Sequence, residues 1–97
     1  MTRHLLKANC KTVHLGGFSP KLEPALTVDS GDRIDIETYS GYYIADQAPP
    51  EFLTPEFLDI CQNLPPNRKV GPGPHLLTGP IYVNNAEPGN VLEIHIE

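Results

Sequence analysis

His75 is the first side chain of this sequence whose type and setting suit chemistry. It lies among turn residues, directly before an apolar segment, where an imidazole can line a pocket or bind a metal ion. A surface or hydrogen-bonded loop histidine is the simpler interpretation, since histidine is neither rare nor costly in loops. Thr78 follows in the same segment, and with Gly79 and Pro80 it is expected to shape the entrance of a strand more than to touch a substrate.

A second set of candidate metal ligands comes from the last residues of the sequence. Glu93, His95 and Glu97 alternate with aliphatic residues, so a strand would place all three on one face. Such a face can present metal ligands, with His95 as the candidate nitrogen donor. It also describes any strand face that lies in solvent or is covered by another part of a protein, and that is the interpretation we favour.

Cysteines and tyrosines complete the candidates. Cys10 and Cys61 share neither a metal-binding nor a redox spacing, so reduced thiols are expected. Cys61 falls on the apolar face of an expected helix, whereas a nucleophilic thiol needs an electropositive, partly open setting. Tyr42, with Tyr39 and Tyr43 beside it, can line an opening for a small ligand, although tyrosines at a sheet margin commonly pack and keep a hydrated hydroxyl group.

These residues make no complete catalytic set. Glycine-rich phosphate loops, paired cysteines and the HExxH pattern are all absent from the sequence, so nucleotide chemistry and a self-contained zinc site have no support.

Two hairpins are expected to position the candidates. In residues 25–39, apolar and polar side chains alternate with the period of a half-buried strand, and Ser30-Gly31 supplies a tight turn. Residues 80–83 and 91–96 form the second expected hairpin, around a turn at 87–90 in which Gly89 accepts a positive φ.

One helix is expected between these hairpins. Thr54 is a good N-cap, Pro55 suits the first helical position, and the apolar residues from Phe57 to Leu64 recur on one face. Pro65-Pro66 ends the helix. Residues 41–50 are expected to form a loop or an irregular strand, residues 67–74 a connector, and residues 4–7 and 12–15 two further short strands.

Composition predicts one small, mainly β domain across residues 1–97. Hydrophobic residues make up 39% of the sequence and charged residues 20%, as in globular proteins. The 11 prolines and 8 glycines favour short strands joined by turns over long helices. A net charge of −5 with 7 Lys and Arg argues against a nucleic-acid partner. No apolar run suits a signal peptide or a membrane span, so the cytoplasm is the expected location.

The segment GPHLLTGPIYVNNAEPGNVLEIHI, residues 73–96, resembles the acetamidase/formamidase family. The earlier LTVDSGDRIDIETYSG, residues 26–41, looks like the first hairpin of that family, and the two segments together cover roughly half of the chain. The sequence departs from the family pattern at Asn84-Asn85, where the family usually has Glu-Gly, and at Gly89-Asn90, where it has Gly-Asp. The second exchange is mild, since Asn and Asp both stabilise such turns by hydrogen bonds from the side chain to the backbone.

This resemblance implies a β-sandwich or barrel-like fold of short antiparallel strands, in the N-terminal region of an enzyme that hydrolyses formamide or acetamide to carboxylate and ammonia. Family members are considerably longer, and their acidic and histidine-rich motifs lie downstream of Glu97. Catalytic residues and a divalent metal, zinc or calcium, are therefore expected beyond it, with His75, Thr78 and Tyr42 as candidates for the pocket wall and His75 and His95 as candidate metal ligands. The expected partners are a small amide substrate and either further copies of the chain or the rest of the enzyme. A small non-enzymatic β domain for binding or self-association is the alternative.

Overall fold

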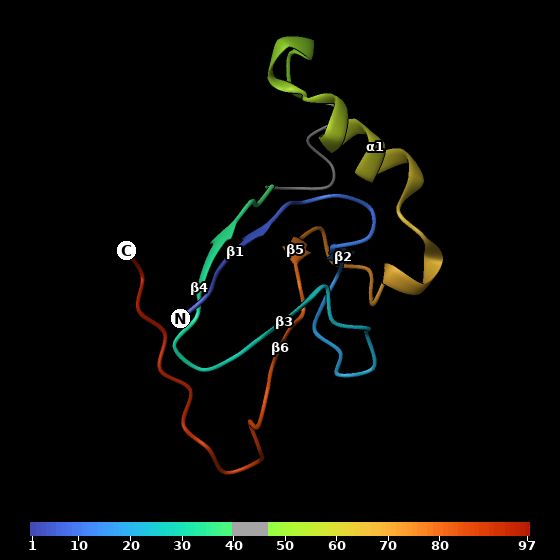
Figure 1. Ribbon diagram of the computed structural model, residues 1–97. Helices are drawn as coiled ribbons and strands as arrows, with labels where there is room; N and C mark the ends of the chain where they lie inside the picture. The colour runs from blue at the N-terminus through green and yellow to red at the C-terminus, as the bar shows by residue number, and fades with distance from the viewer. Residues whose placement is uncertain (40–46) are drawn as a thin grey trace.

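The structure, a computed structural model, describes residues 1–39 and 47–97. Regular structure in these ranges is mostly strand, with one short helix (Figure 1). The elements in chain order are β1 (Arg3–Leu6), β2 (Val13–Leu15), β3 (Leu26–Val28), β4 (Arg33–Ile36), η2 (Pro50–Phe52), α1 (Pro55–Asn63), η3 (Pro66–Arg68), β5 (Leu76–Thr78) and β6 (Ile81–Val83). Tyr42, Tyr43 and most of the expected loop at 41–50 lie outside the described residues.

The described strands pair into three two-stranded sheets. β1 pairs with β4 and β3 with β6, both in parallel, whereas β2 and β5 are antiparallel. The expectation of antiparallel strands is therefore wrong for two of the three pairs. No barrel closes among the described strands.

The first expected hairpin forms its turn but not its pairing. Asp32 N donates to Asp29 O at 3.1 Å, and Gly31 has a φ of 91°, as the turn prediction requires. β3 and β4 nevertheless leave this turn toward different partners. Asp32 contributes to this outcome, because one of its carboxylate oxygens accepts from Thr2 N at 3.0 Å and thereby holds the start of β1 beside β4. Sequence alternation predicted the strands, but such long-range contacts select the partner.

The second expected hairpin is also only half formed. Asn90 N donates to Glu87 O at 3.0 Å and Gly89 has a φ of 96°, so the predicted turn is present. β6 ends at Val83, ahead of this turn, and residues 91–96 are not a strand. The prediction of a strand there is wrong because β6 pairs with β3, and residues 91–96 find no ladder among the described residues.

Helix α1 matches its prediction at both ends. The Thr54 side chain accepts from Phe57 N at 3.1 Å, and Pro55 occupies the first turn, where its missing N–H is not needed. The helix stops at Asn63, directly before Leu64 and the two prolines that cannot continue it. Local sequence alone explains this element.

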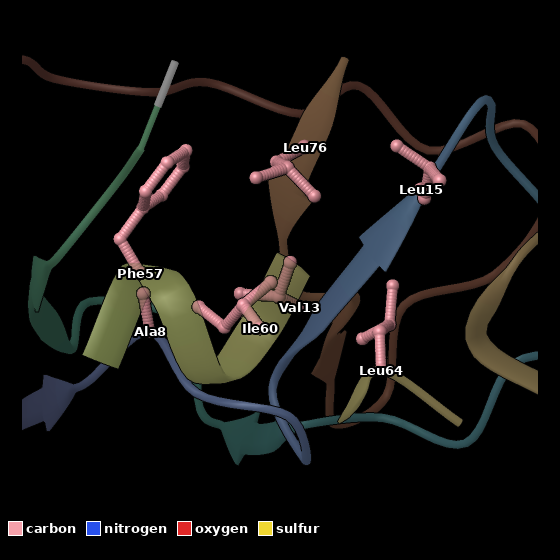
Figure 2. Packing of buried hydrophobic residues seen from close by; sticks show 7 residues of the cluster. All are labelled: Ala8, Val13, Leu15, Phe57, Ile60, Leu64 and Leu76. Carbon is pink, nitrogen blue, oxygen red and sulfur yellow. The ribbon is translucent and has the colours of Figure 1, made fainter. Parts of the chain in front are cut away.

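One small core joins the helix to the strands. Phe57, Ile60 and Leu64 project from one side of α1 and its C-terminal end toward β2 and β5 (Figure 2). Ile60 and Val13 are its most deeply buried members, at 0% and 1% exposed. The remaining members of the cluster are Ala8, Leu15 and Leu76. Burying this face ties α1 to β2 and β5, the two strands that also contribute to the candidate site.

No helix in the described ranges has the length and apolar character needed to cross a membrane.

Candidate functional site

An open groove of about 500 Å³ lies beside β2 and β5. This volume falls within the range of small-molecule sites in proteins. Its lining comes from β2, from β5 with Pro80, from the chain after β2 and from the end of β4 with the residues that follow it. The lining residues are His14, Phe18, Ser19, Pro20, Ile36, Thr38, Leu76, Leu77, Thr78 and Pro80.

His14 is the only ionisable residue among those that line this groove in the described parts of the chain. It is 4% exposed, and its Nδ1 lies 3.2 Å from Gly79 O. A carbonyl oxygen only accepts, so Nδ1 carries a proton in this contact. Among the described residues every buried side-chain nitrogen or oxygen has a partner, and Nδ1 makes the one hydrogen bond of this ring. The imidazole lines the groove, and its Nε2 is the ring nitrogen left for a ligand.

Thr78 joins the two walls of the groove. Its hydroxyl donates to Glu37 O at 2.7 Å, which fastens the end of β5 to the residue after β4. The hydroxyl proton is thus in use, and the oxygen keeps lone pairs that can accept a hydrogen bond. Thr78 lines the groove and also shapes its wall.

Arg68 fixes the turn that follows Thr78. Its guanidinium is buried and donates to three carbonyl oxygens: Nε to Val13 O at 3.0 Å, Nη1 to Glu23 O at 3.2 Å and Nη2 to Gly79 O at 2.8 Å. Burial lowers the pKa of Arg68, with the charge of Glu23 acting in the opposite direction. Gly79 O therefore receives hydrogen bonds from both Arg68 and His14, which holds the groove wall in one position.

The residue types of the lining limit the class of ligand that this groove can bind. None of its described lining residues is Asp, Glu, Lys or Arg, and the polar groups are one imidazole and the hydroxyls of Ser19, Thr38 and Thr78. An ion would lose its hydration here without gaining a counter-charge. A small neutral molecule that both donates and accepts hydrogen bonds, such as a primary amide, fits these groups and the apolar wall.

The other predicted site residues lie elsewhere. His75 is exposed, and the contact that fixes it is made by its backbone, since Gly16 N donates to His75 O at 3.1 Å. His95 is exposed as well, and its Nε2 lies 2.8 Å from a carboxylate oxygen of Glu93. Tyr42 lies outside the described residues.

A metal centre does not assemble in the described parts of the chain. No group of three or more His, Cys, Asp or Glu side chains lies close enough there to hold an ion. His75 and His95 are thus not brought together with further ligands within residues 1–39 and 47–97.

Cys10 and Cys61 are both outside disulfides. Cys10 Sγ lies 3.4 Å from Asp59 Oδ2 and 3.5 Å from Asp59 O. Burial raises the pKa of the Cys10 thiol, and its hydrogen bond to the Asp59 carboxylate and the charge of that group raise it further. A protonated thiol is a poor nucleophile. Cys61 packs partly buried against the core, as its place on α1 predicts.

A polar cluster at the start of β1 has a structural role. One Asp32 carboxylate oxygen accepts from Thr2 N at 3.0 Å, and the other lies 2.9 Å from His4 Nε2 and accepts from Asp29 N at 3.0 Å. These hydrogen bonds, the one with His4 foremost, hold the pKa of Asp32 well below its usual value. The cluster joins β1 to the turn before β4.

Sequence reasoning missed His14 and Arg68. His14 stands between the apolar residues Val13 and Leu15, in a strand whose three residues are all buried. An imidazole in such a strand indicates a hydrogen-bonding role, because burying a polar group without a partner is costly. Arg68 gives no comparable signal. It stands in a proline- and glycine-rich connector, where an arginine is normally exposed.

Comparison with family models, with curated proteins and with solved structures gives no match for this chain.

Proposed function

We propose that residues 1–97 are the N-terminal region of a cytoplasmic acetamidase/formamidase-like enzyme, which hydrolyses a short linear amide to carboxylate and ammonia. This region supplies scaffold and one side of the substrate pocket, and it is inactive alone. In the whole enzyme its short strands belong to a β-sandwich or barrel-like fold.

The observation that carries this proposal is the position of the family-like segment. Leu76, Leu77, Thr78 and Pro80, from the Leu-Thr-Gly-Pro part of that segment, form one wall of a groove whose described lining holds no Asp, Glu, Lys or Arg. A lining without Asp, Glu, Lys or Arg suits an uncharged amide, and it offers no lysine or arginine to the carboxylate that hydrolysis produces.

The groove supplies binding groups but no complete hydrolytic set. An amide N–H can donate to His14 Nε2, and the apolar wall can contact a methyl group. Amide hydrolysis also requires an activated water and donors for the developing oxyanion. A divalent metal, zinc or calcium, would activate that water, and its ligands would come from residues outside this region.

A chimeric enzyme tests the proposal. Residues 1–97 would replace the corresponding N-terminal region of a full-length acetamidase/formamidase, and ammonia release from formamide and acetamide would be measured. We expect an active chimera. Leu77→Trp, which fills the groove, should abolish most of this activity, whereas Tyr82→Trp, on an exposed residue of β6 outside the groove, should retain it.

Folding of each chimera would be checked by circular dichroism and size-exclusion chromatography. A folded chimera that releases no ammonia would contradict the proposal. Strong activity of the 97-residue chain by itself would contradict the assignment of the chemistry to residues outside it.

A second candidate function is a small β domain for binding or self-association. Val91, Leu92, Ile94 and Ile96 favour it, because four large aliphatic side chains that are 72% to 94% exposed within six residues form a surface that other polypeptides bind readily.

A further inference from the structure

The segment from residue 91 to residue 97, here called the tail segment, alternates aliphatic and polar residues, and its aliphatic side chains are exposed. Val91 is 93% exposed, Leu92 and Ile94 are 72% each, and Ile96 is 94%. Monomeric proteins rarely leave so much aliphatic surface in water within one short segment. The tail segment therefore requires a covering partner more than any other described part of the chain.

Backbone groups of the tail segment are available for pairing. Residues 91–97 make no backbone hydrogen bond to the described residues. In Figure 1 the red tail segment is a plain trace that runs along the outside of the molecule to the C-terminus. One surface ion pair, between Arg33 and Glu97 at 3.3 Å, connects it to β4. Both edges of the segment can accept a strand.

Side chains of the tail segment separate into two faces when it is extended. Leu92, Ile94 and Ile96 lie on one face, and Glu93, His95 and Glu97 lie on the other. This is the pattern of a strand with one buried side. Glu93 and His95 contact each other at 2.8 Å within the chain, and both are exposed, so a strand of the partner can take over either contact. The partner must therefore bring a strand with an apolar face and a polar face that suits a carboxylate and an imidazole.

We propose that the tail segment of a second copy of this chain is that partner. The two tail segments pair antiparallel about a two-fold axis at Ile94. Glu93 then lies opposite His95 of the second copy, and the reciprocal pair repeats the contact. Leu92 lies opposite Ile96 on the other face, so the aliphatic side chains of residues 92, 94 and 96 from both strands form one apolar stripe.

Charge complementarity selects this register over its neighbours. A shift of the register by one residue would place Leu92 opposite His95 and Glu93 opposite Ile94. The aliphatic face of one strand would then lie on the same side as the polar face of the other. Centring the pair on Glu93 would oppose two carboxylates, and centring it on His95 would oppose Glu93 to Glu97. Only the register about Ile94 pairs both acidic Glu93 residues with histidines.

This inference deepens the second proposed function, on which it rests, by naming the partner and the register. It does not depend on amide hydrolysis. Because a two-stranded ribbon is marginal by itself, a reversible dimer is expected rather than a permanent one.

Sedimentation equilibrium of the full 97-residue chain tests the charge pairing. Wild type is expected to dimerise reversibly between micromolar and millimolar concentrations. Glu93→Lys and His95→Glu should each weaken the dimer about tenfold, because each places like or unpaired charges in two symmetric contacts. The double variant, with both changes, should recover dimerisation, since it places an ammonium group opposite a carboxylate in the same register.

A disulfide tests the two-fold axis. Oxidation of Ile94→Cys should join the two cysteines at position 94, because opposed residues of an antiparallel pair have close Cβ atoms. The peptide from residue 70 to residue 97 holds no lysine, arginine or native cysteine, so mass spectrometry of a tryptic digest identifies this link. Leu92→Cys is the matched control, because its two copies would lie about 13 Å apart in this register.

Three results would overturn the inference: a wild type that stays monomeric at millimolar concentration, a double variant as weak as the single ones, or a disulfide that forms as readily at position 92 as at 94. In the last two cases a dimer would still support self-association, so failure of the register and failure of the second proposed function are distinguishable.

Discussion

At the scale of single residues, Arg68 is the side chain on which the groove wall depends most. Three backbone carbonyls from different parts of the chain accept from its guanidinium, and one of them, Gly79 O, also binds His14. The planar fork of an arginine suits several fixed acceptors at once, which a lysine ammonium on a flexible stem does not.

Replacing Arg68 by Met should lower the free energy of unfolding by about 2 to 4 kcal/mol, because buried carbonyl oxygens lose their donors. Urea denaturation followed by circular dichroism measures this. Arg3→Met is the matched control: its ion pair with Asp35 is on the surface, with the arginine side chain 72% exposed, and its loss should cost under about 1 kcal/mol. Equal effects of the two substitutions would contradict the structural role of Arg68.

Asp32 makes the stability of the folded chain depend on pH under acidic conditions. Its pKa is lower in the folded chain than the ordinary 3.8, so its contribution to stability is fully present above about pH 4 and is lost as the pH falls toward the folded pKa. Asp32→Asn should remove this part of the pH dependence. Urea midpoints of wild type and variant should therefore differ most near neutral pH and converge in strong acid. A constant difference at all pH values would rule out the ionised Asp32 as the stabilising form.

At the scale of elements, helix α1 and strands β1 to β4 and β6 followed from the sequence, whereas β5 and the strand partners did not, and the strand expected at residues 91–96 did not form. Thr54, Pro55 and the apolar period act within the helix itself, so the sequence contains all that determines it. Turns at Gly31 and Gly89 are equally local. Pairing of β4 with β1 depends on Thr2 and His4 meeting Asp32, and no local pattern predicts a contact across 28 or 30 residues.

Gly16 and Gly31 allow the energetic cost of a strained backbone to be distinguished from the cost of a steric clash. Both have a positive φ, 93° and 91°, which a residue with a Cβ rarely adopts. A Cβ at Gly16 would clash with the backbone of Gly71, in the connector that packs beside β2, whereas a Cβ at Gly31 meets nothing within 4 Å.

Gly31→Ala should therefore cost about 1 kcal/mol, the penalty of the left-handed conformation alone. Gly16→Ala should cost about 3 kcal/mol, since the connector must also move. Thermal and urea unfolding of both variants measure the difference. A Gly31→Ala variant as unstable as Gly16→Ala would show that the contact between Gly16 and the connector is unimportant.

At the scale of the whole molecule, the chain is more extended than a compact domain of its length. Its radius of gyration is 14.6 Å, whereas about 13 Å is typical for a domain of roughly 100 residues. The core around Ile60 and Val13 joins α1 to β2 and β5, and the tail segment lies outside it. This distribution agrees with a region that makes further contacts, whether to the rest of an enzyme or to a second copy.

The candidate site was predictable only in part for the same reason as the fold. Thr78, which lines the groove, was singled out from the sequence because it stands in the family-like segment. His14 was missed because it becomes a site residue only when β2 pairs with β5 and the chain after β2 forms the far side of the groove. Contacts between distant parts of the sequence create this groove, so residue type and spacing identify one wall and not the other.

The central claim is that the groove binds a short neutral amide, and nuclear magnetic resonance titration of the 97-residue chain tests it most directly. Acetamide should shift the signals of His14, Leu77 and Thr78 saturably, in the millimolar range because so small a ligand gains little binding energy. Acetate, which has nearly the same shape but a negative charge, should leave them almost unchanged. Equal shifts with both ligands, or acetamide shifts that are absent from the groove, would contradict the claim.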